Sequence, residues 1–219
     1  MAVHYLPPLA IDGHQSSGTG NAEHLMRVAT RRAAGLDASG WTGELRGNVT
    51  SYFDGLAEEW HTRSSPQRMA VVMDALTRGL DARGPASGLA VEVGSGIGAY
   101  SHLLVERFSR VVAIDLSLAM LRLAPHGPAH RVRADGAALP IPGGAAAAVV
   151  LINAFLFPAE VARVLSPGGV LVWVNSSGEQ TPIYLSVEDL LAALPGEWTG
   201  LSSRAGEGQW CVLAQARLR

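Results

Sequence analysis

The hydrophobic pattern changes near residue 85, and beyond that point short apolar runs alternate with helical stretches. Such alternation is typical of a mostly parallel sheet covered by helices on both faces. The pattern predicts strands at 89–93, 110–114, 131–134, 146–152 and 170–174, and helices at 97–108, 118–123, 158–165 and 186–194. Two further strands, 201–204 and 209–218, flank Gly206-Glu207-Gly208 and predict a hairpin. We therefore expect a doubly wound, mostly parallel α/β sheet of seven strands with a C-terminal antiparallel hairpin.

The N-terminal part has a different pattern. Residues 1–20 are rich in proline, glycine and serine and predict a flexible arm. Asn21 is placed to cap a helix that runs to Leu36, and the glycines of 40–47 should end it. Two more helices are expected at 50–61 and 65–80.

Composition and charge exclude several classes of function. The formal net charge is −2, and no basic block exceeds Arg31-Arg32, so nothing points to nucleic-acid binding. All basic residues are arginine, which excludes chemistry that needs a lysine amine. The one cysteine, Cys211, lies in an apolar stretch and is expected in the core.

The chain shows no signal for a membrane or a metal. No apolar run reaches about 18 residues without proline or charge, and no signal-peptide pattern is present, so we expect a cytoplasmic protein. The histidines lack ligand spacing, so we expect no metal site.

The segment Val91–Gly98, with the sequence VEVGSGIG, carries the strongest chemical signal. An apolar strand runs into a glycine turn and then a predicted helix, and the glycines let a ligand approach the backbone closely. Gly94, Gly96 and Ala99 also satisfy the dinucleotide pattern G-x-G-x-x-G/A, so this turn alone leaves the ligand open.

Two carboxylates follow at the ends of the next strands. Asp115 lies 21 residues beyond Gly94, where it could accept both hydroxyls of a ribose, or else cap the helix after Ser117. Asp135-Gly136 ends the third strand and faces the same crevice, unless it forms only an Asp-Gly turn.

Four stretches, in order, resemble class I methyltransferases that use S-adenosylmethionine (SAM), in the small-molecule, type 11-like branch. They are VEVGSGIG at 91–98, DLSLAML at 115–121, DGAALPIPGG at 135–144 and EVARVLSPGGVLV at 160–172. A fifth, Tyr52-Phe53-Asp54 with Ala57 and Trp60, is similar to the helix that precedes the family's core. The resemblance implies a Rossmann-like methyltransferase domain at 50–219. Residues 1–49 lie outside it, and we expect them to form a flexible arm and a lid helix over the acceptor, or else a tail and a helix packed on the outside.

The resemblance also implies roles around SAM. The methionine part would be held by Glu92 and by the backbone of the glycine turn, at Gly94, Ser95, Gly96 and Gly98. Asp115 would bind the ribose hydroxyls, and Leu116 would pack on the adenine.

Further roles follow from the same resemblance. Asp135 would bind the adenine amino group, and Gly136 would supply a backbone contact. Asn153 would contact the cofactor or the acceptor, and Tyr52 would close over the cofactor. The implied reaction is an in-line methyl transfer to a small-molecule acceptor.

The chain departs from the family pattern in two places. Ala146-Ala147 stands where the family has Phe-Asp, and the connection from Asn153 to Pro158 is short. The second departure suggests an acceptor side near Phe155 and Phe157 that is more open than usual.

The general base is the least defined part of the expected site. His61, Glu59 and His102 are candidates, and His61 is preferred because it follows Trp60 in the covering segment. A solvated surface histidine is the alternative interpretation.

Two other functions stay open at this point. One is an NAD(P)-dependent oxidoreductase, which Glu92 disfavours because that strand position is normally apolar in such enzymes. The other is a SAM-binding regulatory protein without activity. The oligomeric state is not predicted.

Overall fold

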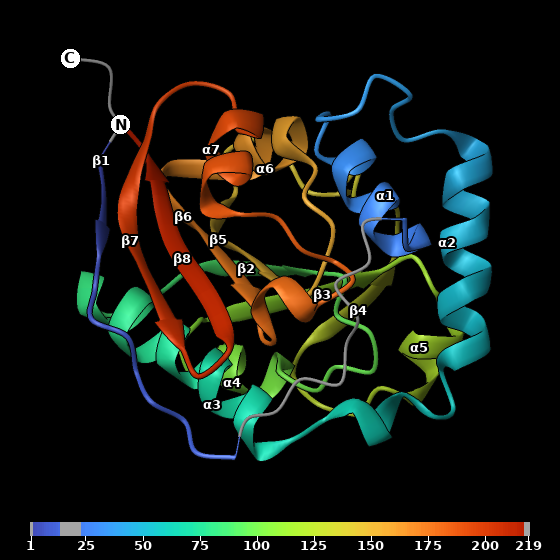
Figure 1. Cartoon of the computed structure of the whole chain (residues 1–219), viewed down its shortest axis with the longest axis horizontal. Coiled ribbons are helices and arrows are strands. Elements are labelled where there is room, and N and C mark those ends of the chain that lie inside the picture. Colours follow the sequence, from blue (N-terminus) through green and yellow to red (C-terminus); the bar gives the residue numbers. More distant parts are fainter. Residues whose placement is uncertain (1, 14–22, 217–219) are drawn as a thin grey trace.

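A computed structural model gives the structure, which describes residues 2–13 and 23–216. A single eight-stranded sheet crosses the molecule (Figure 1). Its strands, in spatial order, are β1 (Ala2–Tyr5), β7 (Trp198–Ala205), β8 (Gly208–Gln215), β6 (Leu165–Asn175), β5 (Ala146–Ile152), β2 (Leu89–Val93), β3 (Arg110–Asp115) and β4 (His130–Arg133). Neighbouring strands are parallel except β8, which is antiparallel to both β6 and β7. The doubly wound sheet and the C-terminal hairpin are confirmed.

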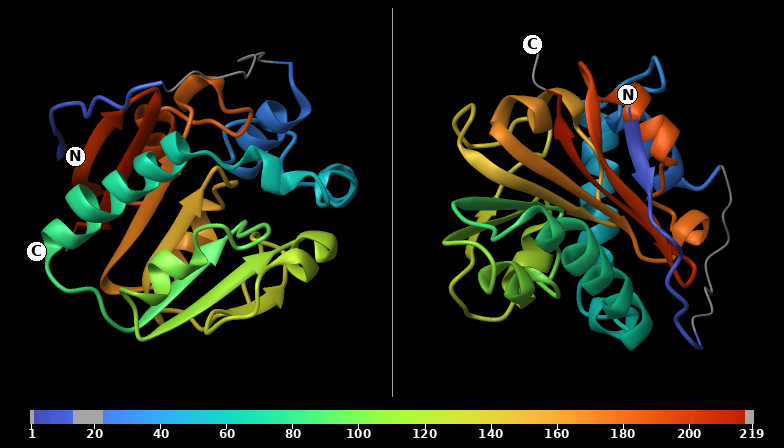
Figure 2. Two further views of the ribbon diagram at one scale, coloured as in Figure 1. Left: turned by 90° about the horizontal axis from the view of Figure 1, so that it is seen from below. Right: turned by 90° about the vertical axis from the view of Figure 1, so that its left-hand side faces the viewer.

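Helices lie on both faces of this sheet (Figure 2). They are α1 (Leu25–Ala33), α2 (Gly43–Leu56), α3 (Pro66–Asp74), α4 (Ser101–Val105), α5 (Leu118–Leu123), α6 (Pro158–Val164) and α7 (Val187–Ala193), with the π-helix η2 (Ala75–Leu80) and 3-10 turns η1 (Trp60–Arg63), η3 (Asp81–Arg83) and η4 (Gly178–Gln180). One buried cluster joins α6 and α7 to the sheet, and a second joins α3, η2 and α4 to the opposite face. Both faces of the central strands are therefore apolar, as their unbroken hydrophobic runs require.

Strand β1 corrects the expectations for strand count and for the arm. Residues 2–5 are not flexible: they pair in parallel with β7, from Ala2 opposite Thr199 to Tyr5 opposite Ser202. The following segment continues along β7, where the Leu9 N–H donates to the Arg204 carbonyl at 2.9 Å. The rest of the predicted arm, from residue 14, lies outside the described residues.

The N-terminal helices differ from the predicted ones in their bounds. His24 caps α1, accepting from the Met26 N–H at 3.1 Å, whereas Asn21 lies outside the described residues. Helix α2 begins at Gly43, so the glycines of 40–47 do not exclude a helix, and it ends at Leu56. The boundary expected between residues 49 and 50 therefore falls inside a helix. It is not a break in the structure.

The glycine turn is followed by a shorter helix than expected. Residues 97–100 form turns, and α4 covers only Ser101–Val105 of the predicted 97–108. Most other elements lie within a few residues of their predicted bounds, and Ser186 caps α7 as its sequence indicates. Cys211 is fully buried in β8, which confirms it as a core residue.

Among the described residues, no helix has the length and apolar character to cross a membrane. Within the same ranges, His, Cys, Asp and Glu side chains form no group of three or more that could hold a metal ion.

Candidate functional site

The site lies where the sheet changes winding direction. Strand β2 pairs with β3 on one side and with β5 on the other. The chain therefore adds strands on one side of β2 first and then on the opposite side. In parallel sheets such a reversal opens a crevice at the carboxyl ends of the strands. The loops after β2, β3, β4 and β5 meet at this crevice and supply the predicted site residues.

The glycine turn after β2 is held open by backbone bonds to β3. The N–H groups of Gly94 and Ser95 both donate to the Ile114 carbonyl, at 2.8 and 3.1 Å. Gly94 has a φ of 71°, and a β-carbon there would lie 2.6 Å from the Ala154 side chain. Only glycine fits this position, because both the dihedral angle and the close approach exclude a side chain.

Glu92 is buried beside this turn, near the end of β2. Its side chain lines the cavity and accepts a hydrogen bond from Ser101 Oγ at 2.5 Å. Burial raises its pKa to about 7, against the opposing effect of the Ser101 bond, and the nearby Asp115 charge adds to the rise. Glu92 is therefore only partly ionised at neutral pH, and a cation in the cavity would favour its carboxylate.

Asp115, at the end of β3, joins the glycine turn to α5. Oδ2 accepts from the Gly96 N–H at 2.7 Å, and Oδ1 accepts from the Ser117 N–H at 2.8 Å. Burial raises the Asp115 pKa, although these N–H bonds oppose the shift. The helix cap is Ser117, whose hydroxyl accepts from the Met120 N–H, so the capping alternative for Asp115 is wrong.

Asp135 and Gly136 follow β4 and lie under the N-terminal segment. Asp135 Oδ1 accepts from the Ala137 N–H at 2.9 Å, which closes the turn expected from Asp-Gly. Oδ2 accepts from Trp41 Nε1 at 3.3 Å and from Arg46 at 3.4 Å. Asp135 therefore also ties α2, and Trp41 two residues before it, to the edge of the cavity.

Asn153 turns the chain at the end of β5. It has a φ of 50° and is the one non-glycine residue of the described ranges with a positive φ. Its amide Nδ2 donates to Ser176 Oγ at 2.9 Å, and Oδ1 accepts from the Ser176 N–H at 2.9 Å. Asparagine tolerates this conformation, and the bonds to Ser176 fix it against the end of β6.

These strand ends surround one cavity of about 1100 Å³, its open mouth included. Nine of the residues predicted for the cofactor line it, namely Glu92, Gly94, Ser95, Gly96, Asp115, Leu116, Asp135, Gly136 and Asn153. The hydroxyl Oγ of Ser95 is buried and has no hydrogen-bond partner, so the cavity holds a polar group that is satisfied only by a ligand or water.

An aromatic wall, defined here as Trp41, Phe53, Trp60, Phe155 and Phe157, forms the other side of the cavity. The Trp41 ring centroid lies 5.6 Å from that of Phe155 and 5.2 Å from that of Phe157. Trp41 thus covers the two phenylalanines, which corrects the expectation that this side is open. Sequence reasoning missed Trp41, because it lies in a glycine-rich stretch outside the resemblance.

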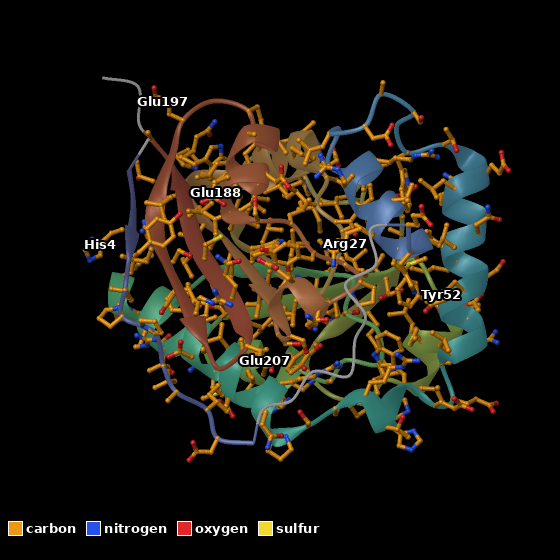
Figure 3. All side chains as sticks on the ribbon, in the orientation of Figure 1. His4, Arg27, Tyr52, Glu188, Glu197 and Glu207 are labelled. Atoms are coloured by element: carbon orange, nitrogen blue, oxygen red, sulfur yellow. The ribbon has the colours of Figure 1, made fainter. Side chains whose placement is uncertain are left out.

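Three predicted residues do not line the cavity. Tyr52 lies on α2 (Figure 3). Its ring makes edge contacts with Phe53 and His24, and Phe53 lines the cavity in its place. Gly98 shapes the turn through its N–H bond to the Ser95 carbonyl. His61 is exposed and its Nδ1 lies 2.9 Å from the Glu58 carbonyl oxygen, so it is not placed as a base.

The other two base candidates, Glu59 and His102, are also exposed and outside the cavity lining. The basic and aromatic groups that do line the cavity include Arg63, Arg68 and Tyr100, and no sequence motif pointed to these three. Arg63 and Arg68 lie in segment 60–68, which follows α2 after a short turn.

A family model described as "Methyltransferase domain" matches residues 91–173. No curated protein matches the chain in a sequence search. Among solved structures, a complex of DhpI with SAH is similar, with a TM-score of 0.63 and 20% identity, over 81% of this chain and 100% of that one.

Two archaeal structures have the same fold. One contains the Haloferax volcanii Trm112 methyltransferase activator in complex with a methyltransferase, with a TM-score of 0.58, 16% identity, and coverage of 75% of this chain and 98% of that one. The other is a SAM-dependent methyltransferase structure from Methanococcus maripaludis, with a TM-score of 0.56, 18% identity, and coverage of 80% and 94%. Residues 91–173 thus match a methyltransferase domain, and these solved structures share the fold of the chain.

Proposed function

We propose that the chain is a class I SAM-dependent methyltransferase that acts on a small-molecule acceptor held against the aromatic wall. One observation carries the proposal: the strand-end polar residues and the aromatic wall face the same cavity. A cofactor and an apolar acceptor can therefore share one enclosed space.

The glycine turn fits the methionine part of SAM. Glu92 supplies a carboxylate for its ammonium group, and the buried hydroxyl of Ser95 is free to bond a polar atom of the ligand. The absence of side chains at Gly94 and Gly96 leaves the backbone accessible, and Gly98 holds the shape of the turn. We assign the methionine end to these residues.

The nucleoside part fits the ends of β3 and β4. A carboxylate has about four lone-pair sites, so Asp115 can accept ribose hydroxyls while keeping its two backbone bonds. Leu116 offers an apolar surface for the adenine, next to Asp135 and Gly136. Asn153 contributes to the middle of the cavity, between cofactor and acceptor.

SAM supplies a methyl group on a sulfonium sulfur, and the chain's own residues align the acceptor with it and exclude water. Trp41 and Phe53 close the cavity from the N-terminal side. We therefore propose that the lid is the segment from Trp41 to Phe53. Residues 2–9 lie on β7, at the far edge of the sheet.

Transfer of a labelled methyl group tests the proposed function. The protein is incubated with methyl-labelled SAM and, separately, with a metabolite extract, a peptide library and oligonucleotides. We expect label in the small-molecule fraction alone, with release of S-adenosylhomocysteine (SAH). Label in the peptide or nucleic-acid fraction would overturn the small-molecule acceptor.

Two controls sharpen this experiment. SAH binding to the folded protein, measured by calorimetry, shows whether the cavity takes the cofactor at all. Phe155→Leu should reduce transfer more than SAH affinity, because Phe155 packs against Trp41 and Phe53 in the aromatic wall and, unlike Trp41, has no hydrogen bond to Asp135. SAH binding with no transfer to any fraction would instead support a regulatory, non-catalytic role.

A further inference from the structure

Two arginine side chains line the cavity beside the aromatic wall. Arg63 ends η1, and its guanidinium carbon lies 5.2 Å from the centroid of the Trp60 ring. Arg68 lies in the first turn of α3 and donates through Nη1 to the Arg63 carbonyl at 2.8 Å. The two cationic side chains are thus held together on one short segment.

Neither guanidinium has a carboxylate partner. Within residues 2–13 and 23–216, every ion pair involves other arginines, and no acidic oxygen lies within 4.0 Å of Arg63 or Arg68. Arg46, which lies near the same cavity, is paired with Asp135. The two cavity-lining charges are therefore available to an anion that enters the cavity.

The cofactor does not supply enough negative charge for both arginines. SAM carries a single carboxylate, while its ammonium and sulfonium groups are positive. The acidic residues of the lining, Glu92, Asp115 and Asp135, lie at the strand ends on the cofactor side. One positive charge beside the aromatic wall is left without a counter-charge when the cofactor is bound.

We propose that the acceptor is an organic anion: a flat, apolar body that carries a carboxylate, phosphate or similar acidic group. This inference rests on the proposed function, because it names the class of acceptor for the same cavity. The anion lies within reach of Arg63 and Arg68, and the body lies on the aromatic wall. Guanidinium groups suit this task, since their paired N–H donors match both oxygens of such an acid.

The aromatic wall favours a flat apolar body for the acceptor. Phe53 contacts Trp60 with ring centroids 5.5 Å apart, and it contacts Phe155 at 6.5 Å. Together with Trp41 these rings form a continuous apolar surface from the lid to the segment that carries the arginines. Flat ligands gain most on such a surface, because stacked and edge contacts add to the burial of apolar area.

Two probes with the same ring, one charged and one neutral, test the inference. Benzoate and benzamide have the same ring, and benzoate alone is ionised at pH 7. Their affinities for the SAH-saturated protein are measured by ligand-observed NMR titration. We expect benzoate to bind at least about tenfold more tightly, the factor that one charge-assisted hydrogen bond supplies.

Variants then locate the preference. Arg63→Gln with Arg68→Gln should abolish it, and Arg63→Gln alone should reduce it. The single variant is informative even if the double variant unfolds, because the Arg63 side chain makes no hydrogen bond within the described residues. Arg122→Gln is the matched control, since Arg122 is exposed on α5 and outside the cavity lining, and it should keep the preference.

The outcomes separate this inference from the proposed function. Equal binding of both probes, no binding of either, or an unchanged preference in the folded Arg63 and Arg68 variants would overturn the anionic acceptor. A loss of SAH affinity in the variants, with the benzoate preference intact, would assign both arginines to the cofactor's carboxylate and also overturn it. A failure of SAH to bind the unaltered protein would instead count against the proposed function itself.

Discussion

Replacing Glu92 by Gln should remove a large part of the pH dependence of stability. Glu92 is fully buried, and its pKa rises from 4.5 to about 7 on folding. The native state therefore binds the Glu92 proton more tightly than the unfolded state does. The stability that this proton supplies is fully present below pH 4.5 and is lost as the pH rises through about 7.

The magnitude follows from the two pKa values. One pKa unit corresponds to about 1.4 kcal/mol, so ionisation of Glu92 should lower the free energy of unfolding by about 3 kcal/mol. Glutamine keeps an oxygen that can accept from Ser101 but carries no proton to lose. Asp115 also has a raised pKa and its charge acts on Glu92, so the difference between the two proteins measures Glu92 together with its interaction with Asp115.

Urea unfolding followed by tryptophan fluorescence at several pH values between 5 and 8 measures this difference. We expect the variant to gain stability relative to the unaltered protein as the pH rises. Adding SAH should shrink the gain, because the ligand's ammonium group favours the Glu92 carboxylate. A difference that stays constant within about 0.5 kcal/mol over this range would refute the reasoning.

Four further substitutions test the site and the fold. Asp115→Ala should weaken SAH binding by about 1.5–3 kcal/mol in calorimetry, because charge-assisted bonds to the ligand are lost, whereas Ser117→Ala should chiefly cost about 1 kcal/mol of stability as a lost helix cap. Gly136→Ala should lower the melting temperature and the SAH affinity, because its β-carbon would lie 2.6 Å from the Phe157 ring and cost about 1–3 kcal/mol. Asp74→Ala should cost about 3 kcal/mol in urea unfolding, because Asp74 is buried and the half-buried Arg78 and the buried indole N–H of Trp210 lose their acceptor.

Each of these expectations has a contrary result. Full SAH affinity in Asp115→Ala would remove the ribose assignment, even if stability fell. For Gly136, the control is Gly127→Ala, which meets nothing within 4 Å, so equal effects of the two substitutions would contradict the close packing argument. Unchanged stability in Asp74→Ala would mean that its buried bonds add nothing to the fold.

The central strands could be predicted because their signal is local. Residues 89–93 and 146–152 form continuous apolar runs and appear as β2 and β5 with the predicted bounds. Polar residues at the ends of such strands line the cavity as expected. They are Glu92, beside the glycine turn, and Asp115, at the end of the next strand. In a parallel sheet, position along the chain places these groups at a common edge.

The elements that were missed depend on distant partners. Nothing local in Ala2–Tyr5 predicts a strand, since β1 exists only through its pairing with β7. Helix α2 contains Gly43 and Gly47, yet Thr42 caps it and Leu45 and Val49 bury its inner face. Tertiary packing overrides the low helix propensity of glycine here.

Only the polar side of the site could be predicted, for the same reason. The aromatic wall draws Trp41 and Phe53 from the N-terminal segment and Phe155 from the loop after β5. No spacing rule connects residues this far apart. His61 was preferred as a base from its place in the chain, but the side chain lies on the outside of η1.

The pairing of β1 with β7 also sets an order of events during synthesis. The ribosome makes β1 long before its partner strand, which begins only at Trp198, and β7 itself pairs with β8. Residues 2–5 therefore stay unpaired until β7 and β8 have been made. Contacts of such long sequence separation slow folding, because the loop must close before the contact forms. We expect docking of this strand to be a late step, so a ribosome-bound chain stalled before β7 should leave residues 2–5 open to proteases.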